Sequence, residues 1–141
     1  MTQNNHEHFI FVPLGGSGEI GMNLNLYGVG HPNKEKWLMV DLGITFSNGS
    51  MSGIDVIMPD TTFIESNRKN LIALVLTHAH EDHLGAVTHL WPRLKCPIYA
   101  TSFTASILKL KIEEAGLQEK IKINIIPMNG KIDLSPFLCE L

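Results

Sequence analysis

Cysteines, long apolar runs and a secretory leader are all scarce or absent in this sequence. Its two cysteines, Cys96 and Cys139, form no CxxC pair, which argues against a disulfide framework and against a cysteine-rich zinc site. No apolar run approaches the roughly 20 residues that span a bilayer. Residues 1–8 are polar and lack the basic-then-apolar order of a signal peptide. We therefore expect a cytoplasmic protein with no membrane partner.

The sequence also lacks an excess of positive charge. Lysine and arginine number 11 against 14 aspartates and glutamates, so the net charge is -3 with histidine neutral. A protein that neutralises many phosphates usually has a basic surface. Any charge that attracts nucleic acid must therefore be local, come from a bound metal, or lie outside this chain.

What is present is the pattern of a single α/β domain. The 141 residues suffice for one domain, 44% are hydrophobic and 18% are charged, as in ordinary globular proteins. The first forty residues read as strands in hairpins, and the rest alternates strand and helix, which predicts helices outside the sheets. Pro13 is expected to end the first strand, and Pro92 to close the second helix. The predicted strands cover 9–12, 23–27, 37–40, 71–76, 98–100 and 121–126, with more sheet at 132–141, and the predicted helices cover 61–67, 84–90 and 104–114.

A dense group of metal-ligand side chains follows the predicted strand at 71–76. Residues 77–83 read THAHEDH, so His78 and His80 are two apart, and Asp82 and His83 fall in the following turn. Imidazole nitrogens and carboxylate oxygens are the ligands that zinc takes in catalytic sites. The carboxyl end of a strand is also where α/β proteins usually place ligands. This spacing therefore predicts a metal site.

The HxHxDH pattern resembles the motif of the metallo-β-lactamase superfamily. That resemblance implies a four-layer αββα sandwich, in which His78 and His80 bind one metal and Asp82 and His83 bind a second, with Asp82 beside the metal-held water. It also implies a supporting role for Asp41 at the end of an earlier strand. Such a carboxylate orients a metal-bound imidazole through its other ring nitrogen.

A glycine-rich turn at 15–21 allows a second interpretation. Residues 16–21 fit the dinucleotide-binding pattern GxGxxG, but that pattern requires the turn to open a helix. The residues that follow alternate polar and apolar as a strand does. We therefore interpret Gly16, Gly18 and Glu19 either as part of an active-site loop, where glycine lets backbone approach closely, or as a plain turn.

Three segments narrow the resemblance to the ribonuclease J family of β-CASP nucleases: residues 14–23, 53–60 and 76–86. The resemblance covers residue 11 to the end. It implies a metal-dependent RNA hydrolase with 5′ exonuclease and endonuclease activity, acting on RNA in RNA processing and decay. It further implies two zinc ions in a complete site, with manganese as the alternative, and a homo-oligomer in the full-length family.

The chain lacks residues that this family uses later in its sequence. The further metal ligands, the second half of the sandwich and the inserted β-CASP domain find no counterpart in residues 1–141, so we expect this N-terminal part of the domain to be inactive alone. Two alternatives stay open. One is another hydrolase of the superfamily, acting on a thioester or a lactam, and the other is a non-catalytic module that binds metal or a partner.

Overall fold

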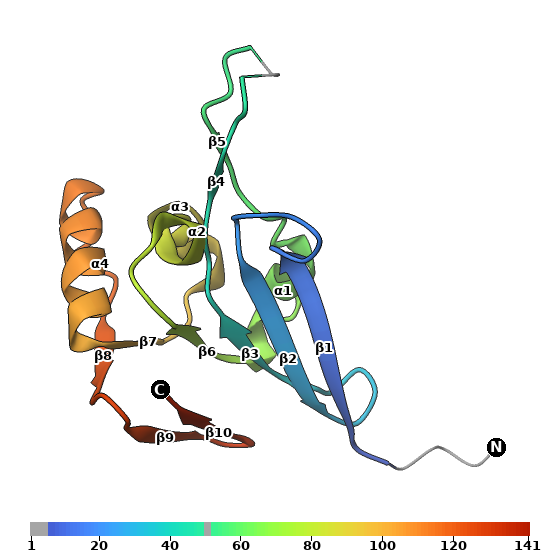
Figure 1. The fold of residues 1–141 in the computed structure, drawn as a ribbon. Helices are drawn as coiled ribbons and strands as arrows, with labels where there is room; N and C mark the ends of the chain where they lie inside the picture. The colour runs from blue at the N-terminus through green and yellow to red at the C-terminus, as the bar shows by residue number, and fades with distance from the viewer. Residues whose placement is uncertain (1–5, 50–51) are drawn as a thin grey trace.

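The computed structural model describes residues 6–49 and 52–141, and within them one mixed sheet organises the fold (Figure 1). The six strands of the sheet lie in the order β1-β2-β3-β6-β7-β8. The first three are antiparallel, and β3, β6, β7 and β8 are parallel. Their bounds are His8–Gly15 (β1), Leu24–Gly30 (β2), Lys36–Val40 (β3), Leu71–Leu76 (β6), Ile98–Thr101 (β7) and Ile123–Ile126 (β8).

The remaining elements connect or cover these strands. The helices are α1 (Thr62–Ser66), α2 (Glu81–Leu84), α3 (Val87–Leu94) and α4 (Ser102–Glu114), with a 3-10 turn, η1, at Arg68–Asn70. Two short hairpins complete the fold: β4 (Thr45–Phe46) with β5 (Val56–Ile57), and β9 (Lys131–Leu134) with β10 (Phe137–Glu140). In Figure 1 the ribbon of β4 and β5 extends away from the sheet. None of the helices in the described ranges has the length and apolar character that crossing a bilayer requires.

The main core lies between the sheet and its helices. Leu74 and Leu76 of β6 are fully buried and pack with Leu84 of α2, Val87 of α3 and Leu108 of α4. This explains the uninterrupted apolar run of β6, because a strand that is covered on both faces has no solvent side.

The opposite face of the sheet carries a smaller cluster. Leu38 and Val75 contact Leu134 and Phe137 of the β9–β10 hairpin. The hairpin thus lies across the sheet from the helices, as Figure 1 also shows.

Both expectations based on proline were wrong. β1 continues past Pro13 to Gly15, with a bulge between the two, which is tolerated because β1 is an edge strand. The helix expected at 84–90 is split into α2 and α3, and α3 includes Pro92. It continues because Leu94, 2% exposed, packs into the main core. It stops at Lys95, whose φ of 53° is left-handed.

Candidate metal centre

The histidine motif lies where β3 and β6 end side by side. These strands are parallel neighbours, so their carboxyl ends meet at one edge of the sheet. Asp41 follows β3, and residues 77–80 lead from β6 into α2, whose N-cap is His80. His78 and His80 are therefore in the loop, as expected, whereas Asp82 and His83 are in the first turn of the helix.

Backbone hydrogen bonds fix α2 against this edge. The Asn23 N–H donates to the Asp82 carbonyl at 2.9 Å, and the Leu42 N–H donates to the His83 carbonyl at 2.8 Å. A Cβ placed on Gly43 would lie 1.7 Å from the Asp82 carbonyl oxygen. Only glycine at this position lets the helix approach so closely.

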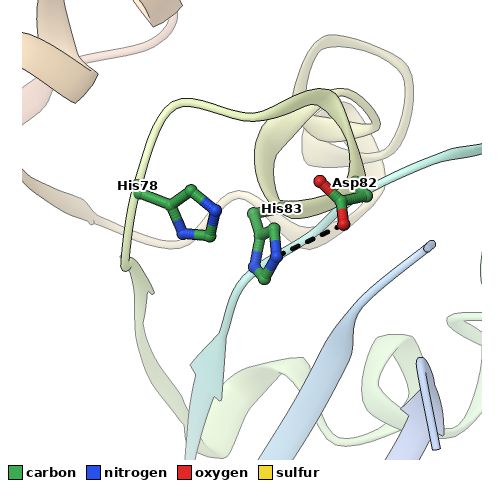
Figure 2. A group of neighbouring side chains, drawn as sticks. All are labelled: His78, Asp82 and His83. Carbon is green, nitrogen blue, oxygen red and sulfur yellow. Dashed lines mark ion pairs between the residues drawn. The ribbon is translucent and has the colours of Figure 1, made fainter. Parts of the chain in front are cut away.

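Three of the predicted ligands form one compact group: His78, Asp82 and His83. Their candidate ligand atoms all lie within 4.8 Å of one another, and the Nε2 of His83 is 3.4 Å from the Oδ2 of Asp82. Figure 2 shows the His83 ring between His78 and Asp82. His80 is exposed and lies beside this group, with its ring centroid 4.7 Å from that of His78.

Asp41 determines which nitrogen of His83 carries a proton. The Asp41 side chain is buried, and its Oδ2 lies 2.7 Å from the Nδ1 of His83. A carboxylate can only accept a hydrogen bond, so Nδ1 must be the donor. In the neutral ring, Nε2 then keeps its lone pair for a metal.

Thr77 determines which ring nitrogen of His78 carries a proton, as Asp41 does for His83. The Thr77 hydroxyl is 2.8 Å from Asp41 Oδ2 and 3.0 Å from the Nδ1 of His78. Its single proton goes to the carboxylate, so the hydroxyl oxygen accepts from the Nδ1–H of His78. Nε2 is again the free nitrogen. The backbone N–H of Thr77 also donates to Asp41, at 2.8 Å.

These residues fit a divalent cation. Two imidazoles offer Nε2 lone pairs, a carboxylate stands beside them, and the opposite ring nitrogens have partners of the kind found behind metal-bound histidines. The composition of the group favours zinc, and it also suits other imidazole-binding metals.

The glycine turn lies next to this group and closes on itself. The N–H of Gly16 donates to the Glu19 carboxylate at 3.1 Å. Residues 16–21 form bends and no helix, and β2 begins at Leu24. The turn therefore lacks the helix that a dinucleotide site requires. Gly18 has open space around it.

Sequence reasoning assigned no role to Asn23 or Thr77. Asn23 lies two residues after the glycine turn, and its side-chain nitrogen is 3.3 Å from the Nε2 of His83. Thr77 begins the THAHEDH segment. Neither threonine nor asparagine stands out as a metal ligand, so only position next to the motif could have drawn attention to them.

Comparison with known proteins identifies the superfamily to which the chain belongs. The family profile described as the metallo-β-lactamase superfamily matches residues 25–128. The chain is 46% identical to ribonuclease J of Sinorhizobium meliloti over 95% of this chain and 24% of that protein. It is 36% identical to ribonuclease J 1 of Streptococcus pyogenes over 84% of this chain and 20% of that protein.

A solved structure of an archaeal metallo-β-lactamase superfamily protein from Sulfolobus tokodaii also matches, with a TM-score of 0.45 and 18% identity, over 94% of this chain and 52% of that one. The chain spans about a quarter or less of the curated relatives named above. The profile match confirms the predicted fold class, an α/β metallo-β-lactamase fold with a mixed sheet, of which this chain carries a part.

Proposed function

The chain belongs to the metallo-β-lactamase superfamily and is a homologue of ribonuclease J, and from this premise we propose that it is part of a metal-dependent RNA hydrolase of ribonuclease J type. The observation that carries the proposal is the group of His78, Asp82 and His83, in a chain 46% identical to a ribonuclease J. Its substrate would be RNA, cleaved by 5′ exonuclease and endonuclease action in RNA processing and decay.

The proposed site holds two divalent ions, zinc first and manganese as the alternative. His78 and His80 would hold one ion, and Asp82 and His83 the other. When bound, the ions supply Lewis acidity toward water and phosphate oxygens. Asp41 contributes by keeping the proton on the Nδ1 of His83, which leaves Nε2 available.

The ions would also change the charge that RNA meets. The chain carries -3 with histidine neutral, whereas two divalent ions add about four positive charges at one edge of the sheet. Attraction of the RNA backbone by this part of the protein would therefore depend on the loaded site, with further contacts from the rest of a longer protein.

We place residues 1–141 as the N-terminal part of a metallo-β-lactamase domain, supported by the small share of each relative that the chain covers. We propose further that the β-CASP domain and the second half of the sandwich belong to the rest of a longer protein, and that this protein is a cytoplasmic homo-oligomer. A catalytic zinc needs about three protein ligands and an open position. The chain offers two strong ligands for each ion, so it should have little or no nuclease activity alone.

The test combines metal binding and RNA cleavage. Zinc and manganese stoichiometry would be measured by equilibrium dialysis for the wild type, His80→Ala, Asp82→Asn and the control His89→Ala, which removes an exposed histidine on α3. We expect binding by the wild type and the control, weakened in the two site variants. A wild type that binds neither metal would refute the metal function. Multiple-turnover RNA cleavage by the wild-type chain that disappears in His80→Ala would show that the site is complete in this chain, against our proposal.

A further inference from the structure

The side chain of Asn23 reaches the proposed metal ligands from the side opposite Asp41. Its Nδ2 is 3.0 Å from the Asp82 carbonyl oxygen, 3.5 Å from Asp82 Oδ2 and 3.3 Å from His83 Nε2. All three atoms are acceptors when Asp41 holds the proton on Nδ1 of a neutral His83. The amide nitrogen must therefore face them, and the amide oxygen faces the glycine turn.

Without a donor between them, two of these acceptors would repel each other. His83 Nε2 and Asp82 Oδ2 are 3.4 Å apart, and each presents a lone pair. A cation between them removes the repulsion, and so does an N–H. We propose that Asn23 is a positioning residue, whose side-chain amide holds Asp82 and His83 in the arrangement that a divalent cation requires. This inference rests on the proposed metal function.

The backbone of Asn23 is fixed, which makes the amide a firm support. Its N–H donates to the Asp82 carbonyl, and its own carbonyl accepts from the Gly43 N–H at 3.0 Å. When a cation takes the Nε2 lone pair of His83, the two amide hydrogens still have the two Asp82 oxygens as acceptors. The amide therefore prepares the site and continues to orient the carboxylate afterwards.

Gly16 gives this side chain its room. A Cβ on Gly16 would lie 2.2 Å from Asn23 Oδ1 and 3.1 Å from its Cα, whereas a Cβ on Gly18 would meet nothing within 4 Å. The two glycines have similar left-handed φ angles, +83° and +75°, so alanine is strained at both. Only Gly16→Ala displaces Asn23, and Gly18→Ala is therefore a matched control for the strain.

The experiment uses the 141-residue chain with Asn23→Ala, Gly16→Ala and Gly18→Ala. Cobalt affinity is measured by its visible absorption against a competing chelator, and thermal unfolding by circular dichroism verifies the fold. We expect Asn23→Ala and Gly16→Ala to weaken cobalt binding by about 10–100-fold, the usual effect of losing a residue that orients a metal ligand. Gly18→Ala should bind like the wild type.

Imidazole nitrogen NMR of the metal-free chain provides a second measurement, independent of metal binding. The Nε2 resonance of His83 should move in Asn23→Ala and Gly16→Ala and stay in place in Gly18→Ala. If the wild type takes no cobalt, the proposed metal function fails, and the NMR measurement alone decides the role of Asn23. An unmoved Nε2 resonance in Asn23→Ala would overturn the inference. Equal weakening of cobalt binding by Gly18→Ala and Gly16→Ala would overturn the role of Gly16.

Discussion

Replacing Asp41 by asparagine should weaken metal binding while leaving most of the fold intact. The Asp41 side chain accepts hydrogen bonds from the Thr77 N–H, the Thr77 hydroxyl and the Nδ1–H of His83. An amide has one accepting oxygen and one donating nitrogen. If the oxygen stays on the Thr77 side, the new N–H₂ group faces the Nδ1–H of His83, and two donors meet.

His83 can escape this clash by moving its proton to Nε2. Nδ1 then accepts from the new amide, and the Nε2–H faces Asp82 Oδ2, which lies 3.4 Å away. The Asn23 amide, whose nitrogen is 3.3 Å from Nε2, must then direct both hydrogens to the two Asp82 oxygens. The metal-free protein therefore loses at most about 1–3 kcal/mol of unfolding free energy, the cost of one buried unpaired polar group. A proton on Nε2, however, blocks the metal, and affinity should fall by about 10–100-fold.

The assay is a zinc titration against a chelator, with thermal unfolding of the metal-free proteins measured in parallel. Asp133→Asn on β9 is the control, because it removes one exposed negative charge on the hairpin across the sheet. Zinc binding by Asp41→Asn as tight as that of the control would refute the proposed role of Asp41. A loss of zinc affinity that arises only because the metal-free variant is unfolded would refute it equally.

Three further predictions concern other residues. Thr77→Val should weaken zinc binding by roughly 2–10-fold, corresponding to about 0.5–1.5 kcal/mol for one hydrogen bond, because His78 loses its Nδ1 partner; the zinc titration described above measures it, and an unchanged affinity contradicts it. Burial raises the pKa of the Cys96 thiol to about 12, so iodoacetamide at pH 8 should modify Cys139 before Cys96 in the folded protein and both after denaturation; mass spectrometry of the peptides decides. Burial also raises the pKa of Glu35, but the hydrogen bonds its carboxylate accepts outweigh this and leave the pKa below 4.5. The stabilisation that the Glu35 carboxylate gives the folded state is therefore fully present above pH 4.5, and it is lost as the pH falls through the lowered pKa that Glu35 has in the folded protein. Glu35→Gln should reduce stability at pH 7, and denaturant melts should show the difference shrinking below about pH 4.5; a constant difference would count against this account.

Local patterns predicted the strands that the core requires. The run at 71–76 coincides with β6, because a strand buried on both faces must be apolar throughout. The end of α4 near Gly116 was also predictable, because glycine often follows the end of a helix in the left-handed conformation. In the structure Gly116 has the corresponding φ of 69°. In each case the physical cause lies within a few residues of its effect.

The features that the sequence did not reveal depend on distant contacts. Pro92 is accommodated because Leu94 packs into the main core, which no local rule anticipates. Gly43 is required by the approach of Asp82, and Asn23 reaches Asp82 across 59 positions. The HxHxDH spacing identified candidate ligands, yet it carried no information about which neighbouring side chains fix the tautomers of the histidine rings.

The candidate site therefore belongs to an edge of the sheet as much as to the motif. β2 and β3 are antiparallel, and Asn25 pairs with Val40, so the start of one strand lies beside the end of the other. This brings Asn23 and Asp41 to the same edge, one on the Nε2 side of His83 and the other on the Nδ1 side. A THAHEDH loop on another scaffold would have the same donor atoms but no fixed tautomers. The hairpin before the motif is thus what turns a histidine-rich loop into a candidate metal centre.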